Sequence, residues 1–242
     1  MDFTSRQCRK RAEDFARCPS SSLGVNCLQF GFCVPTIPAI DFPLSINPDW
    51  MTSLVQSRPE ITLKDMVIPG SHDSGSYSIE NFKVFSAVGR TQTVNVLDQL
   101  HRGSRYLDIR LGESVNGINV FHGCLQGTQF ERVLEEISTF CNDFPGEFVI
   151  IEVVAEYGRT YSSSQKIKTL ELVKDVLGDK MYGEDNKNKL MSTPLKELVL
   201  KGKQVCVLLH SRFYDGLDST DAKIAADYNC FPSGKWMDNK WQ

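Results

Sequence analysis

The feature that most constrains the fold is a nearly continuous run of apolar and β-branched residues at 147–155. Such a run is typical of a parallel strand buried on both faces, because a strand with one wet face alternates apolar and polar side chains. Residues 204–209 form a second run of this type. Strands that alternate with helices favour βα units and a parallel sheet, so the sequence predicts an α/β fold.

Helical patterns surround the predicted strands. Residues 128–141 begin with the capping-box pattern Thr-Gln-Phe-Glu and continue with apolar residues at helical spacing. Residues 162–177 begin with three serines that can cap a second helix. Residues 192–202 begin with Ser-Thr-Pro and end at a glycine, which predicts a third helix.

Ionisable side chains recur where the predicted strands end. Residues 61–68 lead into a first strand, and Pro69-Gly70 ends it, because proline lacks a backbone donor and glycine permits turn dihedrals. His72 and Asp73 follow in a hydroxyl-rich loop. We therefore expect both residues at the rim of the sheet rather than in its core.

Two further strands carry similar signals. Residues 105–111 alternate apolar and polar side chains with a period of two, so Asp108 and Arg110 point to the same face of a strand. Residues 117–121 form another short strand, which ends at His122. A second histidine thus arrives at a strand end, as His72 does.

Right-handed crossovers between parallel strands would bring these strand ends to one side of the sheet. We expect six residues to converge there: His72, Asp108, Arg110, His122, Glu152 and His210. In a (β/α) barrel, that rim is where active sites are built. About five strands can be counted, and the residues from His210 to Gln242 are too few for three further βα units of about 30 residues each. The barrel is therefore expected to be incomplete in this sequence.

The composition suits one large domain with an N-terminal extension. The chain has 242 residues, of which 41% are hydrophobic, enough for a substantial core. Residues 1–58 contain several cysteines and prolines and are predicted to form an irregular arm, and residues 59–242 are predicted to form the domain. A formal net charge of -3 with scattered lysines and arginines argues against nucleic acid as a partner.

No apolar run approaches the roughly 20 residues that span a bilayer, and residues 1–18 lack the apolar segment of a secretory signal. We therefore predict a cytoplasmic protein, with peripheral contact to membranes. A chain of this size does not need disulfides, so free thiols are the expectation for its eight cysteines. A disulfide knot among the four N-terminal cysteines is the alternative, since their spacing does not match a Cys-x-x-Cys zinc pair.

Two histidines at neighbouring strand ends, with an arginine between them in the sequence, suit acid/base cleavage of a phosphodiester. One imidazole would remove a hydroxyl proton, and the other, protonated, would supply one to the leaving oxygen. The planar fork of Arg110 would hold the phosphoryl oxygens. Asp73 and Asp108 would orient the imidazoles, as the third group of a catalytic triad does.

Four motifs stand in order along the chain. They are Pro-Gly-Ser-His-Asp-Ser at 69–74, Gln-Leu-x-x-Gly-x-Arg-Tyr-Leu-Asp-Ile-Arg at 99–110, Phe-His-Gly at 121–123 and Phe-Pro-Gly-Glu-Phe-Val-Ile-Ile at 144–151. Together they resemble the X domain of phosphatidylinositol-specific phospholipase C, and most of all the eukaryotic proteins that carry only this domain. The resemblance covers residues 60–215 and implies a distorted TIM (β/α) barrel.

The resemblance also implies roles by position. His72 would be the general base that activates the inositol 2-hydroxyl, and His122 would be the general acid for the diacylglycerol oxygen. Arg110 would hold the phosphate, Asp108 would support the site, and Asp73 would pair with His122. Cleavage of this kind first yields a cyclic inositol phosphate.

The resemblance bears on metals as well. Calcium-dependent relatives carry an acidic residue at the position of Arg110 and an asparagine at the position of Asp73, so this chain resembles the metal-independent branch. An arginine there supplies positive charge at the phosphate without a carboxylate cage. We therefore expect no metal and no cofactor.

Several positions depart from the family. Bacterial enzymes place basic residues that contact inositol on the fourth and fifth strands, where this chain has Glu152, His210 and Arg212. These three are predicted to line the substrate pocket, and for Glu152 the alternative is a buried carboxylate paired with an arginine. The late aspartate that would support His72 has no counterpart before Gln242.

The leading hypothesis is a metal-independent phosphodiesterase that acts on a phosphoinositide or related phospholipid during transient membrane contact. The alternative is a catalytically weak or inactive X domain that binds phospholipid headgroups or a protein partner. A metal-dependent glycerophosphodiesterase barrel is disfavoured, because no carboxylate cluster of the required kind accompanies His72.

Overall fold

The computed structural model divides the chain into two compact units, Met1–Ser45 and Ile46–Gln242. The residues that the structure describes are 24–27, 33–36, 47–79 and 89–236.

The first unit contains an antiparallel hairpin of β1 (Gly24–Cys27) and β2 (Cys33–Thr36). The prediction of an irregular arm is wrong for these residues. Pro35 lies opposite Val25, and a two-stranded sheet tolerates proline because each strand is an edge. The prediction for the N-terminal thiols lies outside the described side chains.

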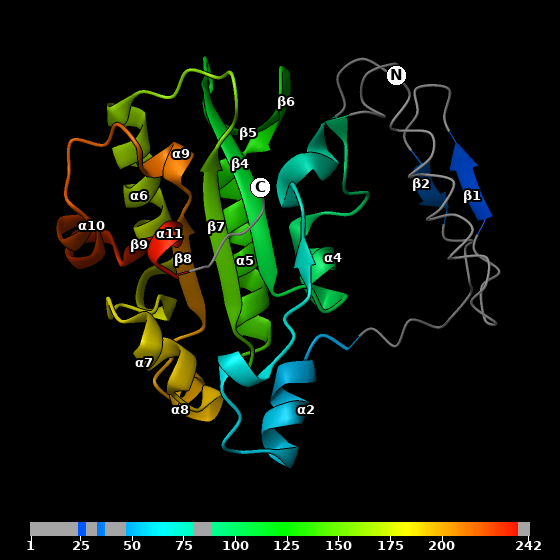
Figure 1. The fold of residues 1–242 in the computed structure, drawn as a ribbon, viewed down its shortest axis with the longest axis vertical. Coiled ribbons are helices and arrows are strands. Elements are labelled where there is room, and N and C mark those ends of the chain that lie inside the picture. Colours follow the sequence, from blue (N-terminus) through cyan, green and yellow to red (C-terminus); the bar gives the residue numbers. More distant parts are fainter. Residues whose placement is uncertain (1–23, 28–32, 37–46, 80–88, 237–242) are drawn as a thin grey trace, which may run out of the picture. The chain divides into compact units, whose positions relative to one another are not determined.

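The second unit is built on a seven-stranded sheet in the order β6-β5-β4-β7-β8-β9, with β3 paired to β4. Its strands are β3 (Gly70–Ser71), β4 (Tyr106–Ser114), β5 (Gly117–His122), β6 (Leu125–Gln129), β7 (Val149–Ala155), β8 (Val205–Leu209) and β9 (Cys230–Pro232). β3, β4, β7, β8 and β9 are parallel, and β5 and β6 are antiparallel hairpin strands. Within the described residues β6 and β9 are the two ends of the sheet, so the α/β fold is an incomplete barrel (Figure 1).

Helices connect and cover the strands (Figure 1). They are α2 (Trp50–Ser57), α4 (Val96–His101), α5 (Phe130–Asp143), α6 (Ser163–Leu177), α7 (Lys187–Ser192), α8 (Leu195–Leu200), α9 (Ser211–Tyr214), α10 (Asp221–Tyr228) and α11 (Ser233–Trp236). Among the described residues, no helix has the length and apolar character that crossing a membrane requires. The predicted boundary between residues 58 and 59 stays a prediction, and α2 belongs to the second unit.

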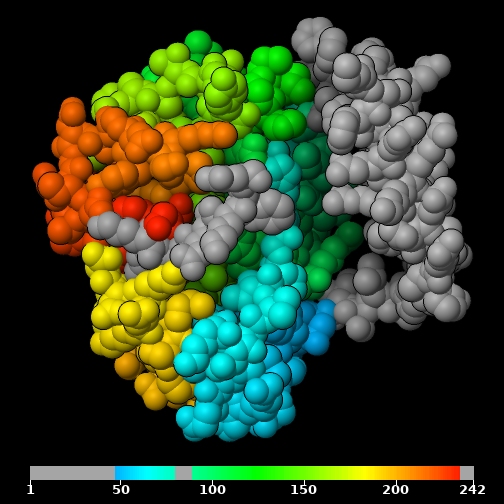
Figure 2. Space-filling view, viewed as in Figure 1, coloured from blue at the N-terminus to red at the C-terminus, as the bar shows by residue number. Residues whose placement is uncertain are grey.

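The sheet is buried on both faces, which explains the continuous apolar runs in the sequence. One face carries Leu107 and Ile109 of β4 and packs against α5 and α6 through residues such as Ile137 and Leu170. The other face carries a second apolar cluster of residues from the strands, α2 and the α7–α8 segment: Met51, Leu63, Phe148, Tyr182, Leu190, Leu195, Leu198, Cys206, Leu208, Ala225 and Phe231. In Figure 2 the yellow α7–α8 segment lies beside the cyan residues that follow α2, where the Leu195 N–H donates to the Ile61 carbonyl at 2.9 Å.

The first strand is much shorter than predicted. The prediction of a strand leading out of residues 61–68 is wrong, because Leu63–Asp65 forms a single 3-10 turn and only Gly70–Ser71 pair with β4. The Asp65 carboxylate accepts hydrogen bonds from the backbone N–H and the hydroxyl of Thr62 at 3.1 and 2.5 Å. This local side-chain pairing favours the turn over an extended chain.

The helix termini differ in how well the sequence predicted them. Ser162 accepts from the Gln165 N–H at 3.4 Å at the start of α6, which confirms that cap. The capping box at 128–131 is wrong. Thr128 belongs to β6 and its N–H donates to Ser78 Oγ at 2.8 Å, so α5 begins only at Phe130 and has no side-chain cap.

A fully buried ion pair joins the residues that precede β4 and β7. Arg105 donates to Glu147 Oε2 from Nε at 3.0 Å and from its terminal nitrogen at 2.7 Å. Arg105 also donates to the carbonyls of Pro48 and Leu100, and Glu147 Oε1 accepts from the hydroxyl of Thr52 at 2.7 Å. Four segments of the chain therefore meet at one desolvated pair.

Glu147→Gln is expected to lower the free energy of unfolding by about 3 kcal/mol, because it leaves the buried charge of Arg105 without a counter-charge. Urea unfolding followed by circular dichroism measures the change. Glu171→Gln on the exposed face of α6 is the matched control. Equal midpoints for the two variants would contradict a structural role for the ion pair.

Candidate active site

In the tight turn after β3, the side chain of His72 is exposed and the side chain of Asp73 is buried. Asp73 has a left-handed backbone (φ 48°), a conformation that aspartate tolerates better than most residues. Its N–H donates to Asp108 Oδ2 at 3.3 Å, and its carbonyl accepts from the Ser76 N–H at 2.8 Å. The side chain of His72 is 61% exposed, while that of Asp73 is 1% exposed.

The buried Asp73 carboxylate faces three cationic or potentially cationic groups. Its Oδ1 lies 2.6 Å from Arg110 Nε. Its Oδ2 lies 3.4 Å from Nε2 of His72 and 3.4 Å from Nε2 of His122. Burial raises the pKa of Asp73, against the charges of Arg110 and His72, which lower it. Asp73 is therefore placed between both histidines rather than beside His122 alone.

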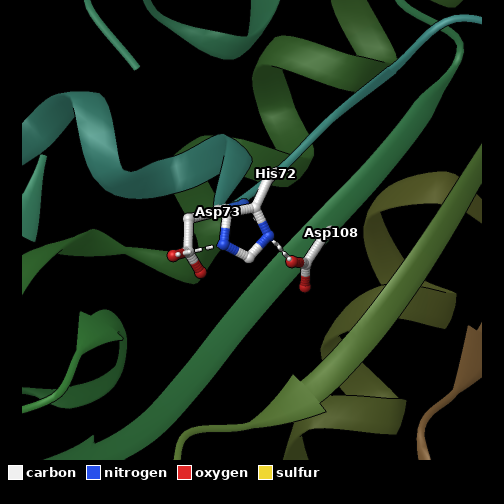
Figure 3. A group of neighbouring side chains, drawn as sticks. All are labelled: His72, Asp73 and Asp108. Carbon is white, nitrogen blue, oxygen red and sulfur yellow. Dashed lines mark hydrogen bonds and ion pairs between the residues drawn. The ribbon is translucent and has the colours of Figure 1, made fainter. Parts of the chain in front are cut away.

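Asp108 contacts the other side of the His72 ring. Its Oδ2 lies 2.9 Å from His72 Nδ1, so the imidazole has one carboxylate at each nitrogen (Figure 3). Asp108 comes from β4, where it shares a face with Tyr106 and Arg110 as the period-two pattern predicts. From the sequence, the carboxylate that supports His72 could not be identified, and in the structure Asp108 contacts its Nδ1.

Arg110 lies among three carboxylates. Besides Asp73, its terminal nitrogens lie 3.2 Å from Asp108 Oδ2 and 3.8 Å from Glu156 Oε2. Partial burial lowers the pKa of Arg110, but Asp108 and Asp73 raise it and prevail. The guanidinium is thus held as a fixed cation at the centre of the cluster.

Glu156 is a site residue that sequence reasoning missed. It follows β7 directly, is buried, and its Oε1 accepts from the N–H of Gly123 at 2.8 Å. Gly123 has a positive φ of 58° and comes next after His122, so Glu156 holds the turn that carries the second histidine. The sequence did carry a signal for it. Glu156 is the first polar residue after the apolar run at 147–155, and other site residues also lie at strand ends.

Glu152 lies on the same face, aligned with Asp108 of the neighbouring strand. It is buried, and its Oε2 accepts from the hydroxyl of Tyr106 at 2.6 Å. The partner is a tyrosine and not the arginine of the alternative interpretation. Glu152 Oε1 has no hydrogen-bond partner in the described part of the chain.

His210 and Arg212 have contacts of their own at the start of α9. His210 Nδ1 accepts from the Arg212 N–H at 3.2 Å and begins α9, and the Arg212 guanidinium lies 5.6 Å from the ring centroid of Tyr157. Among the described residues, these contacts do not join either side chain to His72 or His122.

Three residues could supply ligand atoms to a metal ion. His72, Asp73 and Asp108 each offer one atom, and these atoms lie within 4.8 Å of one another. The guanidinium of Arg110 contacts both carboxylates of this set at 2.6 and 3.2 Å. A divalent cation would have to share them with a fixed positive charge, so the donor set does not fit a metal.

Comparison with known proteins identifies the family. The family model described as "Phosphatidylinositol-specific phospholipase C, X domain" matches residues 66–206, which is more than half of the chain and includes all five clustered residues from His72 to His122. The chain belongs to the PI-PLC X domain family. The matched residues begin before β3 and end in β8.

Curated relatives of this X domain include "PI-PLC X domain-containing protein 3" of Homo sapiens, which is 32% identical over 190 residues, covering 67% of this chain and 57% of the relative. The "1-phosphatidylinositol phosphodiesterase" of Staphylococcus aureus is 29% identical over 206 residues, covering 81% of this chain and 59% of the relative. The solved phosphatidylinositol-specific phospholipase C of Listeria monocytogenes is similar with a TM-score of 0.55 and 27% identity, covering 68% of this chain and 57% of that one. The chain thus spans under two thirds of the length of these relatives.

Asp73→Asn is expected to gain stability relative to the wild type as the pH rises from about 4 to about 7. An aspartate whose folded-state pKa lies above its unfolded value binds more protons when folded, so the wild type loses stability as the pH rises through that folded pKa. Asparagine does not ionise and does not contribute this loss. Urea unfolding at several pH values measures the difference.

Asp175→Asn on the exposed face of α6 is the control for this measurement. A relative loss of stability of Asp73→Asn with rising pH would contradict the prediction. It would mean that the contacts of Asp73 with Arg110 and the histidines outweigh the cost of burial.

Proposed function

We propose that this X domain is a phosphodiesterase that cleaves phosphatidylinositol or a related phospholipid by general acid-base catalysis with two histidines. The observation that carries the proposal is the shared contact of Asp73 Oδ2 with Nε2 of His72 and of His122, each at 3.4 Å. Arg110 lies 2.6 Å from the other oxygen of the same carboxylate. The two imidazoles and the guanidinium therefore converge on one point, as a phosphodiester requires.

His72 is the proposed general base. Asp108 Oδ2 at 2.9 Å from Nδ1 favours the tautomer that carries its proton on Nδ1, which leaves Nε2 to take a proton from an attacking hydroxyl. With a 2-hydroxyl as the nucleophile, attack on the neighbouring phosphorus forms a cyclic phosphate. The exposure of the His72 ring supports this role, because the nucleophile can reach it from solvent or from a lipid surface.

His122 is the proposed general acid. Its Nε2 lies 3.4 Å from Asp73 Oδ2, and in its protonated form the imidazole can transfer a proton to the leaving diacylglycerol oxygen. Arg110 supplies positive charge where negative charge develops on the phosphoryl oxygens. Glu156 holds the Gly123 turn and so supports the position of His122.

Metal-independent turnover is part of the proposal, because Arg110 already neutralises the carboxylates that would ligate a cation. Glu152, His210 and Arg212 are proposed to line the pocket for the headgroup. Glu152 is supported best, since its Oε1 has no hydrogen-bond partner in the described residues and the residue lies beside Asp108. A lipid substrate also requires transient contact with a membrane.

His72→Ala and His122→Ala are each expected to lower kcat for phosphatidylinositol in vesicles by about 1,000-fold, because each removes a proton-transfer group. Turnover by the wild type is expected to persist in excess EDTA. Release of phosphorylated headgroup measures both effects. His101→Ala is the matched control, since His101 packs on Phe140 and Phe144 and no contact in the described residues joins it to His72 or His122.

The outcomes separate the candidate functions. Activity that survives both histidine substitutions would contradict the mechanism, and dependence on calcium would contradict the metal claim. Binding of an inositol phosphate headgroup without hydrolysis would favour the non-catalytic alternative.

Glu152→Gln is expected to raise KM by about tenfold with little change in kcat, because it replaces a charged acceptor for a substrate hydroxyl with a neutral one. Steady-state kinetics on phosphatidylinositol vesicles measures the two constants. Glu171→Gln again serves as the control. A lowered kcat with unchanged KM would instead place Glu152 in the support of Asp108.

A further inference from the structure

The backbone carbonyl of His72 is held by two side chains that are distant in the sequence. Thr91 Oγ1 donates to this oxygen at 3.0 Å, and Gln92 Nε2 donates to it at 2.8 Å. A carbonyl oxygen has two lone pairs, so these two donors use its full capacity. A carbonyl in an exposed loop can accept hydrogen bonds from water and needs no protein donor. Two side-chain donors on this one oxygen therefore indicate that the His72 backbone is held in place.

The same segment is anchored to the turn that carries Asp73. Ser76 Oγ accepts from the N–H of Thr91 at 3.0 Å and from the N–H of Gln92 at 3.2 Å. It also lies 2.8 Å from Thr91 Oγ1. Thr91 gives its only hydroxyl proton to His72, so Ser76 must be the donor in that last contact. A continuous path of hydrogen bonds therefore runs from Ser76 through Thr91 to His72.

The other backbone contacts of this turn belong to the residues on either side of His72, where the Ser71 carbonyl accepts from Ser74 Oγ at 2.8 Å and the Asp73 N–H donates to Asp108. β3 contributes only Gly70 and Ser71 to the sheet, and the His72 side chain is largely exposed. Its ring nitrogens nevertheless lie at 2.9 and 3.4 Å from Asp108 and Asp73. A ring with so little packing can keep these distances only if its backbone is fixed by other means.

We propose that Thr91 and Gln92, anchored by Ser76, are positioning residues that fix the imidazole of His72 between Asp108 and Asp73. These three residues are called the His72 clip. The inference rests on the proposed function for its effect on turnover, but the position of the ring is independent of it. Neither Thr91 nor Gln92 titrates, so the clip acts through geometry and not through charge.

Thr91→Val and Gln92→Met remove the two donors without adding a charge. Each is expected to lower kcat, and the double variant is expected to lower it by about 10- to 100-fold with KM nearly unchanged, as for a misplaced catalytic group. Thr91→Ser keeps the hydroxyl and is expected to retain wild-type kcat. Thr93→Val is the matched control, since Thr93 is exposed and its side chain makes no hydrogen bond to His72 in the described residues.

A second measurement reads the His72 ring directly. The groups that face it are Asp73, Asp108 and Arg110. Nitrogen-detected NMR of the His72 ring is expected to show changed ring-nitrogen chemical shifts in the double variant, because the ring moves away from the Asp108 carboxylate. This readout needs no turnover. An inactive wild type would thus refute the proposed function, while the ring-nitrogen shifts would still test whether the clip positions His72.

Three results would overturn the proposal. The first is a double variant with wild-type kcat and wild-type ring-nitrogen shifts of His72. The second is a fall in kcat with unchanged ring-nitrogen shifts of His72, which would indicate general destabilisation. The third is equal behaviour of Thr91→Ser and Thr91→Val. Should the double variant fail to fold, this pair of single variants carries the test.

Discussion

The buried pair of Arg105 and Glu147 is the interaction on which the rest of the structure depends. The two residues precede adjacent parallel strands, and their contact at 2.7 Å accompanies the register in which Tyr106 lies beside Ile150. A slip by one residue would exchange the two faces of β4. Asp108 and Arg110 would then enter the apolar layer under α5 and α6, and the site would be lost.

The same register gathers several carboxylates around one cation, the Arg110 guanidinium of β4. One guanidinium, that of Arg110, faces the carboxylates of Asp73, Asp108 and Glu156, and burial raises the pKa of Asp73. A chain selected for stability alone would not bury this many acidic groups around one cation. His72 and His122 can each take up a proton, and their positive charge would offset part of this negative charge. These are the same protonation states that the proposed acid-base chemistry would use.

The sequence predicted the elements whose signal is long and periodic. α5, α6, β7 and β8 stand where apolar spacing or continuous runs placed them. For elements whose formation depends on contacts with other residues, the predictions were wrong or absent. The 3-10 turn at Leu63–Asp65 replaces an expected strand because Thr62 pairs with Asp65, and β9 has only three residues, too few for a pattern. Glu156 was missed because a single polar residue after a strand has many possible roles.

The sequence by itself determined the family, the alternation of strands and helices, and which face of β4 carries Asp108 and Arg110, because these follow from residue order and the fixed period of a strand. Only the tertiary structure decided that Asp73 is shared by His72 and His122, that Asp108 contacts His72, and that the His72 carbonyl is held from Thr91 and Gln92. The physical reason is that these contacts join residues separated along the chain. Their distances depend on strand register and on the left-handed turn at Asp73, which no local pattern encodes.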